Sequence, residues 1–298
     1  MVGSALVRSF KKNSKYKVIT TTRKDLDLLS QQKTFNFIKK NKPNLIIDAA
    51  ARVGGIMANN TYRTEFLYQN LQIQNNLIYS ALENDIENFI FLGSSCIYPR
   101  LAKQPIKEEY LLSSALEKTN EPYAIAKIAG LKLCESIRNQ YKKNYISLMP
   151  TNLYGPGDNY DLNDAHVIPA LIKKIHIAKI NESKTIELWG TGKPLRDFLY
   201  VEDLSRACKF VMKNKLKESL INIGSGKEIS IKNIAYLLCE IIEYKGKIVF
   251  DKSKPDGSPR KIIDNTVISS YGWKPKYSLK QGLKLTYKSF LNNDGRNI

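Results

Sequence analysis

The order of apolar and polar residues predicts helices alternating with strands through the first half of the chain. Val2, Leu6 and Phe10 recur at helical spacing, so a helix is expected at the start. Further helical patterns cover residues 30–41, 62–83 and 122–142. Short apolar runs bounded by turn residues predict strands at 16–22, 45–51, 89–92 and 146–152. This alternation indicates a doubly wound parallel sheet with helices on both faces.

The pattern changes after Gly157, where a second, smaller α/β lobe is expected. Its elements are a helix from about residue 166, a strand at 185–189 and a final helix at 279–291. Two further strands, 198–201 and 220–223, are expected to return to the first sheet. The expected division is residues 1–156 plus 196–224 for the first lobe and 157–195 plus 225–298 for the second.

The composition, 43% hydrophobic and 25% charged, is typical of a soluble globular protein. The chain shows neither an apolar run of membrane-spanning length nor a cleavable signal, so we expect a cytoplasmic protein without a membrane partner. The four cysteines lie far apart and form no CxxC pair. This spacing predicts neither a disulfide framework nor a metal site.

The formal net charge of +19 has two explanations. It could attract a nucleic acid or another anion, or it could reflect lysines spread over solvated helix faces. Lysine is scattered through the chain, with neither a basic stripe nor a nucleic-acid-binding motif. We therefore expect no nucleic-acid partner, although a diphosphate ligand would gain from the positive field.

The strongest chemical signal lies at the end of the strand predicted at 89–92. Ser94, Ser95 and Cys96 follow Gly93 there and present two hydroxyls and a thiol. Open parallel sheets bind ligands beyond the carboxyl ends of their strands. A single cysteine at a strand end is more often a packing residue than a catalytic one. The triplet is therefore a candidate site whose role depends on other groups.

Tyr123 and Lys127 are such groups, because four residues apart they share one face of a predicted helix. A nearby ammonium lowers the pKa of a phenol, so Tyr123 could exchange a proton with a substrate oxygen. Ser94 could hydrogen-bond the same oxygen. Together they could interconvert a carbonyl and an alcohol with a nicotinamide. The YxxxK spacing alone is weak evidence, but a strand ending in Ser about 30 residues earlier strengthens it.

On these residues the chain resembles the extended short-chain dehydrogenase/reductase family of nucleotide-sugar enzymes, and within it the GDP-L-fucose synthase group. Matching segments run through nearly the whole length: VGGIMANNTY, FLGSSCIYP, LAKQPIKE, TNEPYAIAKIAG, MPTNLYGPGDN, HVIPALI, GTGKPLRDFLYVEDL and KPDGSPRK. The resemblance implies a Rossmann-like doubly wound parallel sheet with a smaller α/β C-terminal substrate lobe. It also implies conversion of GDP-4-keto-6-deoxy-D-mannose to GDP-L-fucose, by 3,5-epimerisation and then NADPH-dependent reduction of the 4-keto group.

The resemblance assigns Ser94, Tyr123 and Lys127 to the reduction, and Cys96 and His166 to the epimerisation as base and acid. A 4-keto group acidifies the protons on C3 and C5, and a thiol and an imidazole both titrate near the working pH. The family-like assignment makes Cys96 the base, but the sequence leaves open which residue has which role. A histidine at a helix start is otherwise often a simple cap. The other histidine, His176, need not face the same pocket.

The cofactor preference follows from the turn after the strand predicted at 16–22. An acidic residue there would bind the ribose hydroxyls of NAD, whereas an Arg accepts the 2′-phosphate of NADPH. Arg23 stands at this point, which favours NADPH, although a solvated turn charge is the alternative. The resemblance implies a cofactor site formed by Gly3, Arg23, Ala50, Leu92, Gly93, Ser94, Ser95, Lys127, Pro150, Asn152, Leu153 and His166.

The resemblance also places the sugar nucleotide against Lys174, Trp189, Arg196 and Asp256. Trp189 could stack on a ring, and Arg196 could pair with the diphosphate. Lys174 stands where the family typically has Arg, which keeps the charge but loses bidentate geometry. The alternative for Trp189 is ordinary packing within the second lobe.

The start of the chain departs from the family pattern, which opens with a strand and a GxxGxxG turn that cradles a pyrophosphate. Residues 1–4 match only the end of that motif. We therefore expect a missing first strand, through a misplaced or truncated start, with a damaged and inactive chain as the alternative. On this hypothesis the 298-residue chain binds NADPH poorly, and an added upstream strand-and-glycine segment restores binding.

Other functions remain possible at this point. One is a reductase or single-centre epimerase for another nucleotide sugar. A dehydratase is disfavoured because acidic residues would be expected where Ser95 and Cys96 stand. A non-catalytic binding protein, whether a truncated remnant or a basic nucleic-acid binder, is the alternative of another class. The helices predicted at 62–83 and 122–142 resemble those through which the family dimerises, so we expect a homodimer.

Overall fold

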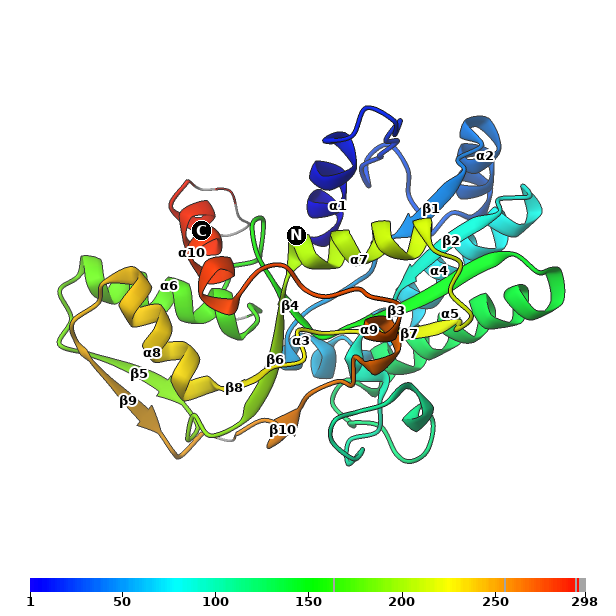
Figure 1. The fold of residues 1–298 in the computed structure, drawn as a ribbon. Helices are drawn as coiled ribbons and strands as arrows, with labels where there is room; N and C mark the ends of the chain where they lie inside the picture. The colour runs from blue at the N-terminus through cyan, green and yellow to red at the C-terminus, as the bar shows by residue number, and fades with distance from the viewer. Residues whose placement is uncertain (163, 255, 293, 295–298) are drawn as a thin grey trace.

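A computed structural model describes residues 1–162, 164–254, 256–292 and 294 of the chain (Figure 1). Its main sheet has four parallel strands in the order β1-β2-β3-β7. The strands are β1 (Leu45–Asp48), β2 (Asn88–Leu92), β3 (Asn144–Pro150) and β7 (Leu220–Ile223). The expected parallel sheet is therefore confirmed, and so is the return of residues 220–223 to it.

Helices cover both faces of this sheet. Successive side chains of β2 point to opposite sides, so both faces are apolar and each packs against helices. Phe89 and Phe91 pack in one core cluster with residues of α2 (Gln31–Asn41), α4 (Arg63–Glu83) and α5 (Glu121–Tyr141). Ile90 and Leu92 pack in another, with residues of α1 (Val2–Lys11) and α7 (Val201–Lys213). The expected helices are thus present, and the sheet is doubly wound.

Two predicted strands differ from the structure. Residues 16–22 form no strand, and the run predicted at 45–51 is a strand only as far as Asp48. Among the described residues, β1 pairs with β2 alone, and no strand lies beside 16–22. Tyr16 and Val18 instead pack against the α1 side of the core. Apolar alternation favours a strand, but a ladder of hydrogen bonds to a neighbour is what forms one.

The strand predicted at 146–152 is split because the chain changes sheets at Thr151. The Thr151 N–H donates to the Ile223 carbonyl of the main sheet at 3.0 Å, whereas Asn152 already pairs with Phe198. A second sheet thus begins, with order β10-β6-β4 and with β8 antiparallel to β6. Its strands are β4 (Asn152–Tyr154), β6 (Leu195–Tyr200), β8 (Glu228–Ser230) and β10 (Arg260–Lys261). Residues 198–201 were expected in the first sheet, and that expectation is wrong.

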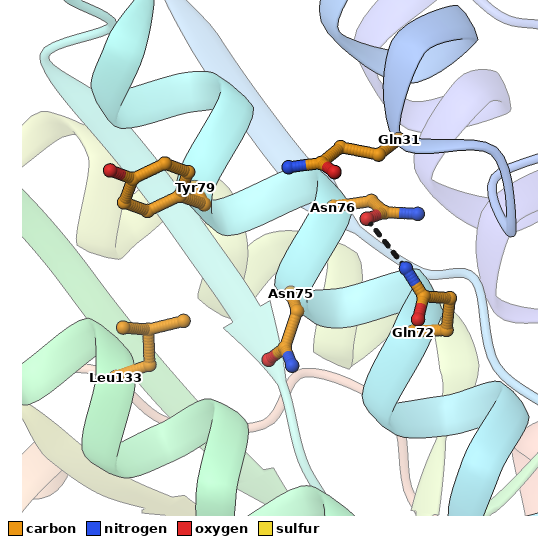
Figure 2. A pocket seen from close by; sticks show the side chains of 6 residues that line it. All are labelled: Gln31, Gln72, Asn75, Asn76, Tyr79 and Leu133. Carbon is orange, nitrogen blue, oxygen red and sulfur yellow. Dashed lines mark hydrogen bonds between the residues drawn. The ribbon is translucent and has the colours of Figure 1, made fainter.

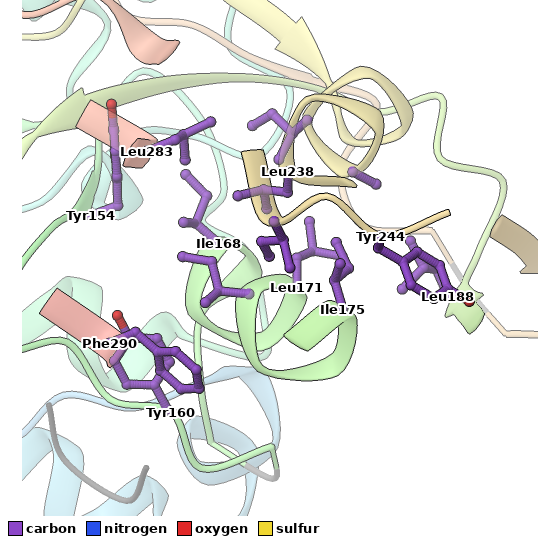
Figure 3. Packing of buried hydrophobic residues seen from close by; sticks show 14 of the residues in the cluster. Tyr154, Tyr160, Ile168, Leu171, Ile175, Leu188, Leu238, Tyr244, Leu283 and Phe290 are labelled. Atoms are coloured by element: carbon purple, nitrogen blue, oxygen red, sulfur yellow. The ribbon is translucent and has the colours of Figure 1, made fainter. Parts of the chain in front are cut away.

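The smaller C-terminal lobe has its own core (Figure 3). Strands β5 (Thr185–Trp189) and β9 (Lys247–Asp251) pair in parallel. Helices α6 (Val167–Ile180), α8 (Ile231–Ile242) and α10 (Leu279–Leu291) supply most of the remaining apolar surface. Tyr160 and Phe290 meet inside this core with their ring centroids 4.8 Å apart. A second α/β lobe, as predicted, is therefore present.

Short elements complete the chain: α3 (Ile56–Thr61), α9 (Thr266–Ser270) and the 3₁₀ turns η1 (Ser95–Ile97) and η2 (Glu108–Tyr110). Within the described part of the chain, no helix combines the length and apolar character needed to cross a membrane. All four cysteines are free. Cys134 and Cys208 are buried in the core.

Candidate active site

The tip of β2 holds Ser94 and Cys96 in a fixed arrangement. The Gly93 N–H donates to the Leu148 carbonyl at 2.9 Å, which keeps the chain on the sheet as far as the tip. Ser94 then caps η1, and its Oγ accepts the Cys96 N–H at 3.2 Å. Both side chains are half-buried. The hydroxyl and the thiol are therefore set side by side at the carboxyl edge of the sheet.

Tyr123 reaches the same point from the first turn of α5. Pro122 is one of the first residues of that helix, a position where its missing N–H costs nothing. The Tyr123 hydroxyl is hydrogen-bonded to Ser94 and lies close enough to Cys96 to feel its charge. Its ring meets Phe66 of α4 edge-on, with centroids 6.4 Å apart. The structure thus brings Ser94, Cys96 and Tyr123 together.

The expected effect of Lys127 on Tyr123 is wrong in this structure. Burial raises the pKa of Tyr123, the charges of Cys96 and Asp48 raise it further, and the Ser94 hydrogen bond only partly opposes them. The Lys127 ammonium instead donates to the Leu92 carbonyl at 2.9 Å and lies 4.6 Å from the centre of the Phe91 ring. The phenol is therefore held in its protonated form, ready to donate a proton.

Cys96 has a cationic neighbour that the sequence did not indicate. Lys261 of β10 places its Nζ 3.4 Å from the Cys96 sulfur. Burial, the largest single influence, raises the pKa of Cys96, but the charge of Lys261 and the hydrogen bonds from Ser94, Lys261 and Asn120 together outweigh it. The pKa of the thiol is consequently lowered, and this favours the thiolate, the form that acts as a base.

Among the described residues, His166 makes no hydrogen bond to Cys96 or Tyr123. It is the exposed N-cap residue of α6. Its loop is anchored by Asp164, whose carboxylate accepts the Gly55 N–H at 2.7 Å. A Cβ on the preceding glycine, Gly54, would lie 3.2 Å from Phe66, the residue that meets Tyr123. The loop thus approaches the site, although the acid–base pair is not assembled.

His176, which was not required to face the same pocket, contacts residues of the second lobe instead. Its Nδ1 lies 3.0 Å from the Tyr287 hydroxyl, and its ring packs edge-on against Tyr287 and Phe290 of α10. Burial lowers its pKa, so the neutral imidazole is favoured. His176 is a packing residue of the second lobe.

The four residues expected to bind the sugar nucleotide lie around the ends of β5 and β6. Trp189 is 66% exposed, and Lys174 and Lys254 each place an ammonium 5.7 Å from its ring centroid. Asp256 accepts hydrogen bonds from Thr191, which lower its pKa. Half-buried Arg196 is coupled electrostatically to both Cys96 and Asp256. This connects the predicted diphosphate residues to the thiol.

The expected cofactor residues divide between a cavity and the strand tips. A cavity of about 340 Å³ is lined by Arg23, Arg52 and the alanines at 49–51, beyond the end of β1. The first turn of α1 is close by, since a Cβ on Gly3 would lie 3.9 Å from that of Ala49. Besides Lys127 of α5 and His166 before α6, the other expected residues lie at or just after the carboxyl ends of β2 and β3: Leu92, Gly93, Ser94, Ser95, Pro150, Asn152 and Leu153. Ala50 and Arg23, both expected to bind the cofactor, therefore line the same pocket.

A family model matches residues 1–224, described as the NAD dependent epimerase/dehydratase family. The chain belongs to the NAD dependent epimerase/dehydratase family. A relative named GDP-L-fucose synthase, from Sinorhizobium fredii, is 52% identical over 293 residues, covering 98% of this chain and 93% of the relative.

Two solved structures of similar fold extend this comparison. A GDP-6-OMe-4-keto-L-xylo-heptose reductase from C. jejuni has a TM-score of 0.92 at 35% identity, covering 98% of this chain and 95% of the other. A GDP-L-fucose synthetase from Naegleria fowleri bound to NADP has a TM-score of 0.90 at 30% identity, covering 98% and 90%. Both similarities run through the two lobes of this member of the epimerase/dehydratase family.

A larger hollow of about 460 Å³ lies elsewhere, between α2, α4 and α5. Figure 2 shows its lining: Gln31, Gln72, Asn75, Asn76, Tyr79 and Leu133. None of the candidate catalytic, cofactor or sugar-nucleotide residues is among them. The larger hollow is therefore separate from the candidate strand-tip site and is a feature of the helix face.

Two residues of the site were missed in the sequence. Lys261 and Asn120 lie inside segments that carry the family resemblance, KPDGSPRK and TNEPYAIAKIAG, but neither was given a role. Their position depends on pairing of β10 with β6 and on the loop before α5, which local patterns do not specify. The resemblance of those segments was the only available signal.

Proposed function

We propose that the chain converts GDP-4-keto-6-deoxy-D-mannose to GDP-L-fucose, by epimerisation at C3 and C5 followed by NADPH-dependent reduction at C4. The observation that carries this proposal is the meeting of two proton-transfer groups at one strand tip. Cys96 and Tyr123 are both hydrogen-bonded to Ser94. One group has a lowered pKa and the other a raised pKa, which suits a base and a proton donor.

The epimerisation needs a base and an acid on opposite faces of the sugar. Cys96 as thiolate removes a proton from C3 or C5, and the electron pair moves onto the 4-keto oxygen as an enolate. His166 as imidazolium returns a proton to the other face of the carbon. Its exposed position on the loop that reaches Gly55 supports this role.

The reduction uses the phenol. When bound, NADPH supplies a hydride to C4. Tyr123 donates its proton to O4 as the alcohol forms, and Ser94 orients the carbonyl through its hydroxyl. Lys127 lies beneath the tip of β2, with its Nζ 2.9 Å from the Leu92 carbonyl, where it can hold the ribose of the cofactor. The raised pKa of Tyr123 keeps the proton on the phenol until it is transferred.

The residues present fit NADPH. Three small alanines and two arginines line the cavity beyond β1, so an adenosine fits beside groups that can pair with a 2′-phosphate. We assign the 2′-phosphate to Arg23. The N-terminal turn of α1, with Gly3, lies next to the same cavity and provides free N–H groups for a pyrophosphate. Residues 1–156 and 196–224 would accordingly form the cofactor lobe.

The sugar nucleotide is assigned to the other lobe, residues 157–195 and 225–298, together with Arg196. Arg196 and Lys174 provide positive charge for the diphosphate, and exposed Trp189 provides a flat surface for a ring. Asp256 is held by Thr191 and can accept a hydroxyl hydrogen bond. The coupling of Arg196 to Cys96 supports a bound sugar that extends from these residues to the thiol.

A second candidate is the reduction of another GDP-linked 4-keto sugar without epimerisation, as the name of the C. jejuni structural neighbour suggests. The strand-tip thiol favours the two-step reaction. A reductase needs only Ser94, Tyr123 and Lys127, and has no use for a thiol held beside an ammonium.

The deciding experiment uses Cys96→Ser. Incubation of GDP-4-keto-6-deoxy-D-mannose with the parent protein in D₂O should place deuterium at C3 and C5, seen by NMR. Loss of the thiolate base should slow this exchange by roughly 10²–10⁴-fold, the usual contribution of general base catalysis. Tight binding of the substrate should survive, because Ser keeps the shape and one hydrogen bond.

The control is Cys239→Ser, a half-buried thiol whose pKa is raised to about 11 by burial and which lies in the second lobe. It should exchange deuterium at the parent rate. Equal exchange by Cys96→Ser and the parent, or consumption of NADPH by the parent without deuterium at C3 and C5, would overturn the two-step proposal.

We also propose that the protein forms a homodimer through α4 and α5. The outward face of this helix pair exposes several large apolar or aromatic side chains: Tyr68 at 60%, Tyr79 at 49%, Ile125 at 44% and Tyr141 at 51%. The hollow shown in Figure 2 lies on the same surface. Exposed aromatic groups of this kind are typical of protein–protein interfaces.

A further inference from the structure

Lys261 reaches Cys96 because of the register of a two-residue strand. In β10, Lys261 is the parallel partner of Arg196 in β6. Successive strand residues point to opposite sides. Arg260 points to Glu228, with which it makes a two-pronged ion pair at 2.7 and 3.1 Å. Lys261 is thereby directed to the other side, where its Nζ lies 3.4 Å from the Cys96 sulfur.

No carboxylate of the described residues forms an ion pair with this ammonium, although eleven such pairs are present elsewhere. Its side-chain contact with Cys96 is part-buried. A partly desolvated ammonium without a carboxylate partner stabilises whichever neighbour can become negative.

The other groups that face the thiol come from three further elements. Ser94 and Asn120 offer neutral hydrogen bonds, and Arg196 of β6 adds a second, more distant positive charge. A negative charge on Cys96 raises the pKa of Tyr123 of α5, because two negative charges at this point would repel each other. The thiol and the phenol therefore cannot both ionise readily, and Lys261 lies against the thiol.

We propose that Lys261 is the positioning residue that holds Cys96 as a thiolate for its role as the base of the epimerisation. This inference rests on the proposed function and deepens it. The C–H bond at C3 or C5 breaks, an S–H bond forms, and the electron pair is stored as the enolate of the 4-keto group. His166 enters protonated and gives its proton to the opposite face of the carbon. Exchange with water resets both groups.

The test measures the thiolate directly, without substrate or cofactor. Iodoacetamide alkylates only the thiolate, so the pH dependence of alkylation at Cys96, located by mass spectrometry, reports its ionisation. In Lys261→Gln the rate at pH 7 should fall about tenfold or more, the effect of removing an opposite charge within 4–6 Å. Lys261→Arg should restore most of the rate. The buried thiols Cys134 and Cys208 should stay unmodified throughout.

Lys247→Gln is the matched control, because it removes an exposed lysine from β9 in the second lobe. In Lys247→Gln, Cys96 should be alkylated at the parent rate. A melting temperature of Lys261→Gln within a few degrees of the parent shows that the fold is kept. If Lys261→Gln alkylates at the parent rate over the whole pH range, or if Lys261→Arg is as slow as Lys261→Gln, the proposal is overturned.

A second readout links the ionisation to the reaction. The pH profile of deuterium entry at C3 and C5 should move to higher pH in Lys261→Gln together with the alkylation profile, whereas a merely structural role would lower the rate equally at every pH. If the parent protein incorporates no deuterium at C3 or C5 of the substrate, but alkylation of Cys96 depends on Lys261, the proposed function fails while the assignment of the thiolate stands. The two failures are thus distinguishable.

Discussion

An acidic and a basic side chain are buried together beneath the tip of β2. Asp48, the last residue of β1, is the register partner of Phe91, and the Lys127 ammonium lies over that same ring. The side chains of Asp48 and Lys127 belong to residues only 2% and 3% exposed. Burial raises the pKa of Asp48 and lowers that of Lys127, while each charge favours ionisation of the other. Lys127 therefore depends on Asp48 to stay charged in an apolar setting.

We predict that Asp48→Asn moves the alkaline limb of the C4 reduction to lower pH. Without the negative charge, the pKa of Lys127 falls further, so the ammonium is lost sooner as the pH rises. The measurement is the initial rate of NADPH consumption across the pH range. Asp85→Asn, at an exposed turn, is the control and should keep the parent profile. An unchanged alkaline limb in Asp48→Asn would mean that Asp48 carries no charge in the fold.

At the scale of elements, α5 determines where the reductase groups lie. Gly130 allows it to approach closely, because a Cβ there would lie 2.7 Å from Phe91 and 2.8 Å from Gln74 of α4. The Gln74 amide in turn donates to the Ala126 carbonyl, in the middle of α5. This close contact of α4, α5 and β2 places Lys127, one turn before Gly130, against the sheet. The opposite sides of the same two helices form the proposed dimer surface.

The dimer prediction can be tested with Tyr79→Glu. A charge at the rim of the hollow in Figure 2 would be desolvated in an interface, so the dimer should weaken strongly. Light scattering on the eluting protein should give twice 34.0 kDa for the parent and a mass near 34.0 kDa for the variant. Tyr236→Glu, equally exposed at 48% on α8, is the control and should remain dimeric. A parent mass of 34.0 kDa at all concentrations would contradict the proposal.

At the scale of the whole molecule, Asp197 joins the two sheets. Its backbone carbonyl in β6 accepts hydrogen bonds from Thr151 and Asn152, where the chain leaves the main sheet. Its carboxylate accepts the Ser225 N–H at 3.0 Å, just after β7. Asp197 is fully buried, and burial, only partly opposed by hydrogen bonds from Ser225 and Gly226, raises its pKa to about 6. The junction thus contains a carboxyl group that resists ionisation.

We predict that Asp197→Asn gains stability relative to the parent as the pH rises from about 4 to about 6. The unfolded carboxyl ionises near 3.8 and the folded one near 6, so the parent loses folding free energy across that window and no more above it. The difference should reach about 3 kcal/mol at most, at 1.36 kcal/mol per pKa unit. Urea unfolding of both proteins at several pH values measures it. A difference independent of pH would exclude this role.

Much of the fold follows from local pattern. The helical spacing of residues 30–41, 62–83 and 122–142 and the short apolar runs at 89–92, 185–189 and 220–223 all correspond to elements of the structure. The predictions that were wrong concerned strands, which form only where a neighbouring strand is available for pairing. Residues 16–22 have strand character but no neighbouring strand, and residues 198–201 pair in the second sheet because the chain leaves the first at Thr151.

The sequence by itself determined the local chemistry of this protein: two hydroxyls and a thiol at a strand tip, and a phenol four residues before an ammonium on one helix face. Covalent spacing and backbone period fix such relations wherever the element forms. Only the tertiary structure decided that Lys261 lies against Cys96 and that Lys127 turns away from Tyr123 to the Leu92 carbonyl. The reason is physical, because ionisation depends on burial and on charges distant in sequence, and both exist only once the chain has folded.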